Sequence, residues 1–351
     1  MLKIRRFSGG VEQIVIRRPD DWHVHFRDGD KLAYTVPPIS HVFGKVVAMP
    51  NLKPPVTTAK GAEAYRHRLL TSSTDMGFKP YPSLYLTNRT SVDDIVAARA
   101  AGLIAAKLYP AHATTNSEDG VGDVGTLDEV LEAMSTLNLA LQIHGETTDP
   151  AHDIFDRESA FVSTVLDPLC NRHPELKVVL EHVTSREGVN FVARAGECVA
   201  ATVTPHHLEI ERNDLLVGGM QPHLFCLPIP KTRRDREALL DVVMGGNPKF
   251  FLGSDSAPHP RHAKESACCA AGVYCGTATM SHYAEIFERH GSLDRLEAFS
   301  SEFGSDFYGL PRNSDTIVME RRPFTMPSTM PFGDDEVVPY KAGQKISWRV
   351  L

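Results

Sequence analysis

Short apolar or β-branched runs recur along this chain, and longer stretches with apolar residues at three- and four-residue spacing lie between them. The short runs predict β-strands, and the longer stretches predict amphipathic helices. Strands are predicted at residues 22–26, 45–49, 83–86, 104–108, 140–144, 177–182, 198–203 and 250–254. Helices are predicted at residues 58–70, 92–101, 127–137, 154–169, 186–195 and 234–244.

Capping signals support three of these helix starts. A Ser or Thr stands three positions before an acidic residue in each of three pairs: Ser91 with Asp94, Thr126 with Glu129 and Thr184 with Glu187. This spacing is typical of a capping box, in which the two side chains bond to each other's backbone N–H.

Strand and helix alternate throughout, and near-continuous apolar strands need helices over their outer surface. The predicted fold class is therefore α/β, a TIM (β/α)8 barrel with short terminal extensions. We expect one domain over residues 1–351, because such a barrel takes about 250 residues and tolerates insertions. Residues 321–351 are expected to form a C-terminal extension packed on the barrel. The Gly- and Pro-rich segment 216–230 predicts a functional loop.

The charge balance argues against nucleic acid as a partner. The 37 basic and 44 acidic residues give a net charge of −7, and the basic residues are scattered. No stretch approaches the roughly 18 apolar residues that cross a bilayer, and the first ten residues lack the apolar core of a signal peptide. We therefore expect a cytoplasmic protein that does not bind membranes.

Six cysteines are few for this length, and an intracellular protein keeps them reduced, so no disulfides are expected. Cys268, Cys269 and Cys275 could suggest a zinc cluster. The two-residue spacing of structural zinc sites is absent, however, and adjacent cysteines diverge. Small thiols in a loop are the preferred interpretation.

A His-x-His pattern introduces the candidate chemistry. Alternate residues of a strand share a face, so His23 and His25 are predicted to point together into one end of the barrel, where two imidazoles suit a divalent metal. The pattern alone is ambiguous, since surface strands also carry alternating polar residues.

Position strengthens the metal hypothesis. His144, His182 and Asp255 stand at the C-terminal ends of predicted strands, the rim at which barrel enzymes build their sites. Lys107 lies in the fourth predicted strand. An ammonium has no lone pair, so Lys107 could bind metal only after CO2 converts it to a carbamate, which can bridge two cations.

At this point the sequence resembles bacterial-type, single-domain dihydroorotases of the amidohydrolase superfamily. The resemblance rests on Asp-Trp-His-Val-His-Phe-Arg-Asp at 21–28, Met-Pro-Asn at 49–51, Ala-Lys-Leu-Tyr-Pro at 106–110, Gln-Ile-His-Gly-Glu at 142–146, Glu-His-Val-Thr at 181–184, Leu-Val-Gly-Gly at 216–219, Pro-His-Leu-Phe-Cys-Leu-Pro at 222–228 and Gly-Ser-Asp-Ser-Ala-Pro-His at 253–259. It covers nearly the whole chain. It implies the metal-dependent hydrolase type of barrel.

The resemblance implies two zinc ions per subunit. His23, His25 and Asp255 would hold one ion, His144 and His182 would hold the other, and N6-carboxylated Lys107 and a hydroxide would bridge both. The implied activity is reversible cyclisation of N-carbamoyl-L-aspartate to L-dihydroorotate, the third step of pyrimidine synthesis. Asp255 would carry the proton to and from the amide nitrogen.

Further roles follow from the same resemblance. Arg27, Asn51 and His259 would bind the substrate carboxylate, since Arg can grip a carboxylate with two parallel hydrogen bonds. The implied substrate-binding set comprises His25, Arg27, Asn51, His144, Leu227, His259 and Ala271, with Leu227 and Ala271 acting through backbone groups. Thr114 and Thr115 would belong to a lid loop that helps exclude water. A homodimer is also implied.

Three other histidines are interpreted as structural or solvated. His112 departs from the small amide residue expected at its position, and we interpret it as a solvated loop residue. His206 and His207 would point in opposite directions on a strand, and Pro205 interrupts the run, so they are predicted to be structural rather than ligands.

Three alternatives remain open. A cyclic-amidase relative such as a dihydropyrimidinase or hydantoinase would share the metal centre, but those usually carry a β-sandwich, for which the termini here are short, and Arg27 with Asn51 favours a carboxylate-bearing substrate. A dihydroorotase-like protein that has lost catalysis and serves as an assembly partner would lack ligands, whereas this set is complete. A sugar- or phosphate-binding barrel without metal would be unaffected by chelators.

Overall fold

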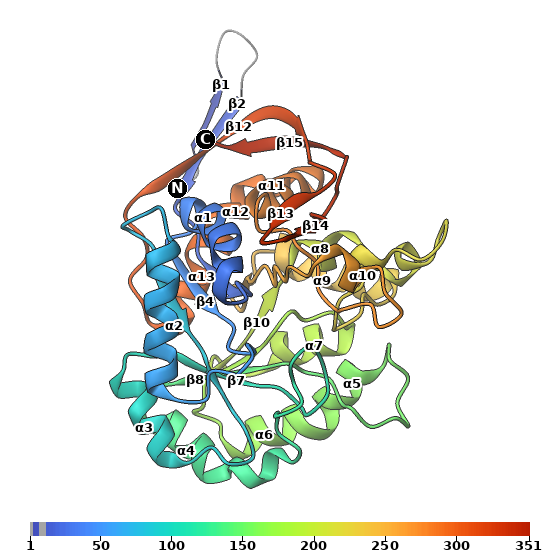
Figure 1. Ribbon diagram of the computed structural model, residues 1–351. Helices are drawn as coiled ribbons and strands as arrows, with labels where there is room; N and C mark the ends of the chain where they lie inside the picture. Colours follow the sequence, from blue (N-terminus) through green and yellow to red (C-terminus); the bar gives the residue numbers. More distant parts are fainter. Residues whose placement is uncertain (1–2, 7–11) are drawn as a thin grey trace.

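The computed structural model describes residues 3–6 and 12–351. Nine short strands surround its centre (Figure 1): β3 Asp21–Val24, β4 Lys45–Ala48, β5 Lys79–Pro82, β6 Leu84–Tyr85, β7 Ala105–Leu108, β8 Ala140–Ile143, β9 Val178–Leu180, β10 Val199–Val203 and β11 Phe250–Leu252. All their pairings are parallel, in two runs: β3-β4-β5, and β6 through β11 in sequence order.

Two junctions join these runs into a barrel. β5 and β6 follow one another with only Ser83 between them, and Ser83 N donates to Ala48 O at 3.0 Å, so they fill one barrel position together. At the other junction Asp255 N donates to His23 O at 2.9 Å, and His25 N donates to Ser256 O at 3.1 Å. Eight positions therefore close on themselves, which confirms the predicted (β/α)8 barrel.

Helices cover the outside of the barrel (Figure 1). They are α1 Leu32–Val42, α2 Ala59–Ser72, α3 Val92–Ala100, α4 Asp128–Thr136, α5 Arg157–Phe161, α6 Asp167–Arg172, α7 Arg186–Arg194, α8 Pro205–Glu209, α9 Arg233–Met244, α10 Arg261–Lys264, α11 Thr279–Arg289, α12 Leu296–Ser301 and α13 Phe303–Tyr308. A π-helical turn, Val162–Leu166, joins α5 to α6, and 3-10 turns occur at Gly29–Lys31, Val124–Leu127, Arg212–Leu215, Pro222–Leu224 and Leu293–Arg295. Among the described residues, none of these helices combines the length and apolar character needed to span a bilayer.

The predicted strands and helices are all present, but proline obscured two elements. The third strand was predicted at 83–86, whereas the barrel uses β5 with its Lys-Pro-Tyr-Pro sequence and then the two-residue β6. β5 lies at the edge of its sheet, which is where proline is tolerated. Helix α1 was not predicted, because it contains Pro37 and Pro38.

One of the three predicted capping boxes is confirmed. Ser91 Oγ accepts a hydrogen bond from Asp94 N, and the Asp94 carboxylate accepts one from Ser91 N. The other two are wrong. Asp123 caps the 3-10 turn that precedes α4. Ser185, instead of its neighbour, caps α7 by accepting from Gly188 N, while the hydroxyls of Thr184 and Ser185 both donate to buried Glu158.

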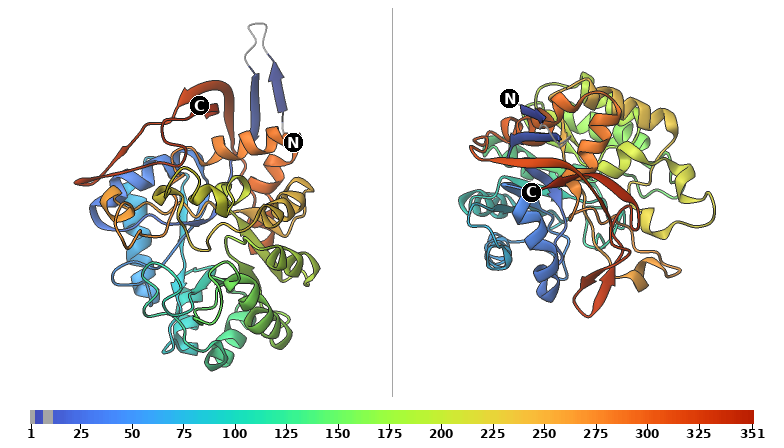
Figure 2. Two further views of the ribbon diagram at one scale, coloured as in Figure 1. Left: turned by 90° about the vertical axis from the view of Figure 1, so that its right-hand side faces the viewer. Right: turned by 90° about the horizontal axis from the view of Figure 1, so that it is seen from above.

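Both ends of the chain meet in a second, antiparallel sheet at one end of the molecule (Figures 1 and 2). Its order is β1-β2-β12-β15, with bounds β1 Lys3–Arg6, β2 Glu12–Arg17, β12 Thr316–Thr325 and β15 Lys345–Val350. A hairpin of β13 Met330–Phe332 and β14 Asp335–Val337 lies between β12 and β15 in the chain. The chain ends in β15, which lies within the expected C-terminal extension. The division into one domain with an extension from residue 321 stays a prediction.

Aromatic packing fills the barrel at the end away from the C-terminal strand ends. Trp22 stacks on Tyr308 with ring centroids 4.7 Å apart, and both rings contact Phe251 edge-on. Gly304 in α13 lies against the Trp22 indole so closely that a Cβ there would overlap the ring. All six cysteines are free thiols in this structure.

This packing predicts that Gly304→Ala destabilises the protein. An added methyl group has to displace the Trp22 ring from its stack, and overpacking of a core costs about 1–3 kcal/mol. The variant should therefore unfold at a lower temperature than the wild-type protein. Gly196→Ala is the matched control, because a Cβ at Gly196 meets no atom within 4 Å. Equal melting temperatures for the two variants would contradict this account of the barrel floor, the end opposite the C-terminal strand ends where Trp22 packs.

Candidate active site

The C-terminal ends of the barrel strands carry a cluster of histidine, lysine and aspartate side chains. His23 lies on β3 and Lys107 on β7, whereas His144, His182 and Asp255 follow β8, β9 and β11. His25 lies just beyond β3, one residue outside its end. Residues far apart in the sequence are therefore brought to one rim, as the strand pattern predicted.

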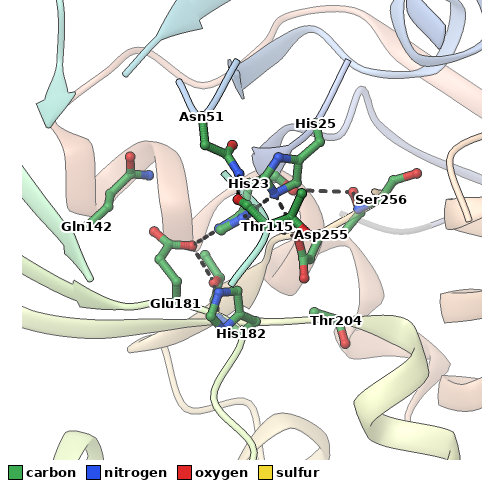
Figure 3. A network of polar contacts seen from close by, with 12 residues as sticks. His23, His25, Asn51, Thr115, Gln142, Glu181, His182, Thr204, Asp255 and Ser256 are labelled. Carbon is green, nitrogen blue, oxygen red and sulfur yellow. Dashed lines mark hydrogen bonds and ion pairs between the residues drawn. The ribbon is translucent and has the colours of Figure 1, made fainter. Parts of the chain in front are cut away.

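Close contacts link the members of this cluster (Figure 3). Oδ1 of Asp255 lies 3.1 Å from His25 Nε2 and 3.3 Å from His23 Nε2, and the two Nε2 atoms are 3.4 Å apart. The His182 ring centroid lies 5.0 Å from that of His23 and 4.9 Å from that of His144. His23, His182 and Asp255 offer ligand atoms within 4.8 Å of one another. These separations suit a shared metal ion.

Two of these side chains project from strained backbone. His182 has φ 41° and Asp255 has φ 44°, in the left-handed region that side chains other than glycine rarely adopt. Arg27, beside the cluster, has φ 65°. Such strain gathers at functional sites, where the surrounding structure enforces a geometry that the chain would not choose.

Lys107 is the least expected member of the cluster. Its ammonium is fully buried, forms no hydrogen bond and lies 5.0 Å from the centre of the Tyr109 ring. Burial lowers the pKa of Lys107 to about 8, because desolvation disfavours the charged form. Nδ1 of His182 is also buried without a partner. Two unpartnered buried nitrogen atoms in one cluster fit a site that holds another group.

Buried carboxylates behind the cluster orient two histidines. Nδ1 of His23 donates to Glu181 at 2.5 Å, which directs its Nε2 lone pair toward Asp255 and His25. Nε2 of His144 donates to Glu146 at 2.8 Å, which leaves Nδ1 as its ligand atom. Metal-binding histidines commonly donate their other N–H in this way. Neither carboxylate was singled out from the sequence, although both lie inside the motifs that carry the resemblance.

A candidate anion-binding group adjoins the cluster. Arg27 donates from Nε to Pro258 O at 2.8 Å, and its Nη2 lies 2.8 Å from Nε2 of His259. Burial lowers the pKa of Arg27 to about 10 and that of His259 to about 2, so the guanidinium keeps its charge and the imidazole is neutral at pH 7. The same Nε2 lies 2.9 Å from Ala271 O. One nitrogen cannot accept from Arg27 and donate to a carbonyl at once, so His259 makes only one of these bonds at a time.

The loop after β7 closes over the cluster. Oγ1 of Thr115 donates to Ala271 O at 3.4 Å, and Nδ2 of Asn51 donates to Thr115 O at 3.0 Å. Asn116 donates back to Asn51 O at 2.9 Å. These bonds tie the lid residues to two other segments of the rim.

The cluster and this loop line one small cavity. The structure brings nearly all of the predicted site residues to it: the lining includes His23, His25, Arg27, Asn51, Thr114, Thr115, His144, His182, Leu227, Asp255 and Ala271. Lys107 is buried within the same cluster, and His259 reaches the cavity wall through Arg27 and Ala271. The lining also includes Tyr109, Ala257 and Gly272, which the sequence did not single out. His112 lies outside it, exposed in the loop.

Comparison with known proteins shows the family to which this chain belongs. A match to the amidohydrolase family covers residues 15–317. A dihydroorotase of Alkalilimnicola ehrlichii is 51% identical over 343 residues, which span 97% of this chain and all of that protein. The chain belongs to the amidohydrolase family, among its dihydroorotases.

Two crystal structures of dihydroorotases have the same fold. The Campylobacter jejuni enzyme superposes with a TM-score of 0.88 at 35% identity and covers 96% of each chain. The Saccharomyces cerevisiae enzyme, solved in complex with 5-fluoroorotic acid, has a TM-score of 0.90 at 32% identity and covers 97% of this chain and 98% of its own. The similarity therefore extends over the barrel and the terminal sheet alike.

A second buried cluster of this amidohydrolase contains His206 and His207. Both lie on α8, which begins at Pro205, so the strand geometry that was predicted for them is wrong. Nδ1 of His207 pairs with the Thr204 hydroxyl at 2.8 Å, and its Nε2 donates to Pro228 O at 3.0 Å. His207 and Cys226 also offer ligand atoms near His206. Because both nitrogens of His207 are already used, a structural role remains our prediction.

Three buried histidines, His206, His207 and His282, predict that the protein loses stability in acid. Burial lowers the pKa of His207 to about 4 and that of His282 to about 3, and it holds that of His206 well below its usual value. The unfolded chain takes up protons below about pH 6.5, where the folded protein does not. The free energy of unfolding should thus fall as pH drops below 6.5, by roughly 1 kcal/mol per pH unit for each such group.

The comparison of His206→Gln/His282→Gln with wild type tests this. The double variant should show a shallower decline in melting temperature between pH 6.5 and 5. His67→Gln, at an exposed position, is the control and should follow wild type. Identical slopes for all three proteins would show that the buried pair does not govern acid sensitivity.

Proposed function

We propose that this chain catalyses the reversible interconversion of N-carbamoyl-L-aspartate and L-dihydroorotate. One observation carries the proposal: a histidine and aspartate cluster suited to metal, with Lys107 buried within it, shares a single small cavity with Arg27 and Asn51. A cyclic amide that bears a carboxylate needs both parts, one to attack the ring and one to hold the substrate's charge. The dihydroorotase relatives that match nearly the whole chain support this choice.

The residues present fit a pair of metal ions. His23, His25 and Asp255 would hold one zinc ion, His144 and His182 would hold the second, and carboxylated Lys107 would be shared. When bound, the two ions supply Lewis-acid polarisation of a carbonyl and a water nucleophile that is active near neutral pH. Support comes from the orphaned Lys107 amine, because carboxylation by CO2 replaces a buried, unpartnered cation with an anion among histidines.

The chain's own residues bind the substrate and move its proton. Asp255 lines the cavity and carries the proton to or from the amide nitrogen as the ring opens or closes. Arg27 and Asn51 line the same cavity, where they bind the substrate carboxylate. Thr114 and Thr115 exclude water as the lid closes. Backbone groups of Leu227 and Ala271 form hydrogen bonds with the edge of the substrate ring.

The other interpretations predict different behaviour. A dihydropyrimidinase or hydantoinase has no substrate carboxylate for Arg27 and His259 to bind. A non-catalytic assembly partner would show no turnover, and a metal-free sugar- or phosphate-binding barrel would ignore chelators. Assembly as a homodimer and a cytoplasmic location remain predictions.

An assay of the purified protein tests the proposed function. L-dihydroorotate should be hydrolysed and N-carbamoyl-L-aspartate cyclised, whereas dihydrouracil and hydantoin, which lack the carboxylate, should react far more slowly. Chelation should abolish turnover, and added zinc should restore it. Equal rates on hydantoin, or activity that survives chelation with no metal bound, would contradict the proposal.

Lys107→Ala tests the shared ligand. Loss of the amine removes the proposed shared ligand, so metal analysis should show fewer than two zinc ions per chain and turnover should fall. Lys107→Arg serves as a matched variant, because it keeps a cation that cannot be carboxylated and should fail in the same way. Two retained zinc ions with normal turnover in either variant would rule out a bridging role.

A further inference from the structure

Lys231 carries a buried charge that the proposed mechanism does not use. It follows the loop that carries Leu227, and its side chain is only 3% exposed. Its Nζ donates to Ile229 O at 2.8 Å. The carboxylate beside it belongs to Glu146, whose Oε1 lies 4.0 Å from Nζ and has no hydrogen-bond partner.

Glu146 connects this lysine to the cluster. Its side chain is 2% exposed, and its other oxygen, Oε2, accepts from Nε2 of His144 at 2.8 Å. A continuous path of contacts therefore runs from Ile229, two residues past Leu227, through the Lys231 ammonium and the Glu146 carboxylate to His144. The residues at its two ends are 85 positions apart in the sequence.

We propose that Lys231 is a positioning residue for the second metal site. Its ammonium holds Oε1 of Glu146, so that Oε2 faces His144 and the imidazole presents Nδ1 to the metal. Through Ile229 the same ammonium fixes the loop segment that follows Leu227. Lys231 thereby fixes the position of the loop that carries Leu227 relative to the metal ligand His144. The proposal rests on the two-metal centre proposed above.

The carboxylate behind the first metal site is held differently. Glu181 accepts from His23 and from the Thr202 hydroxyl, at 2.7 Å, on the same Oε2 atom, and its Oε1 has no partner. No lysine or arginine forms a salt bridge with Glu181 among the described residues. The effect of Lys231 should thus be confined to the metal held by His144 and His182.

Lys264 provides a matched control. It is also buried, and its Nζ donates to three backbone carbonyls at 2.7–2.8 Å, those of Phe225, Ala270 and Gly272. Like Lys231 it fixes the loop near Leu227. Among the described residues, no carboxylate forms a salt bridge with Lys264, and its three hydrogen-bond partners are backbone carbonyls. A defect caused only by loosening of the loop should appear in both lysine variants.

The experiment compares Lys231→Met, Glu146→Gln and Lys264→Met with wild type, each zinc-loaded. Metal content is followed against rising chelator concentration, and anomalous scattering at the zinc edge identifies which ion is lost. Loss of the groups that orient a metal-bound histidine typically lowers metal affinity about 10- to 100-fold. Lys231→Met and Glu146→Gln should each release the His144 ion at correspondingly lower chelator concentration and keep the other ion. Lys264→Met should retain both ions like wild type.

A second variant guards against misfolding, because removal of one partner from a buried ion pair can destabilise the whole protein. Lys231→Met/Glu146→Gln leaves no unpaired charge and should lose the same ion as either single variant, without a further decrease. Unchanged chelator resistance in the Lys231 variants, loss of both ions together, or equal loss in Lys264→Met would overturn the positioning role. If wild type binds fewer than two ions, the metal centre itself fails, which is a separate and distinguishable result.

Discussion

Closure of the barrel between β3 and β11 is the constraint on which the site depends. The bond from Asp255 N to His23 O joins the first strand to the last, and it fixes the Asp255 carboxylate against the imidazoles of His23 and His25. A parallel barrel gathers all of its C-terminal strand ends at one rim, so the same closure brings His182 and Lys107 to this place. An open sheet of the same strands would leave the first and last strands at opposite edges.

Desolvation explains why this rim is chemically unusual. Charged and polar groups packed there lose water, and an unpartnered buried polar atom is expensive to keep. Lys107 Nζ and His182 Nδ1 are such atoms, and His182 and Asp255 add strained backbone. A fold tolerates such unpartnered atoms and strained backbone only where the surrounding contacts hold the structure in place. Glu181 and Glu146 do this locally, since each fixes one imidazole from behind through a short hydrogen bond.

The sequence predicted the barrel well because its strands are buried on both faces and read as apolar runs. It failed where local signals mislead. The Lys-Pro-Tyr-Pro sequence does not read as a strand although it forms β5, and Ser185 caps α7 although Thr184 has the capping-box spacing. The candidate ligands could be named because they follow predicted strands in recognisable motifs. The contact between Lys231 and Glu146 could not, since no local pattern reports a pairing between residues so far apart in the sequence.

The two ends of the barrel divide stability from chemistry. At the floor, Trp22 stacks on Tyr308 and both rings contact Phe251 edge-on. Asp20 pairs there with Lys45 at 2.9 Å, although burial raises the pKa of that carboxyl. The floor is mainly apolar, and this buried charge has a partner. The rim keeps unmatched nitrogen atoms directed at one cavity. Trp22 and His23 are neighbours on β3; the Trp22 ring packs in the floor, and the His23 imidazole lines the cavity at the rim. A single strand therefore contributes both to the packed floor and to the candidate ligand cluster.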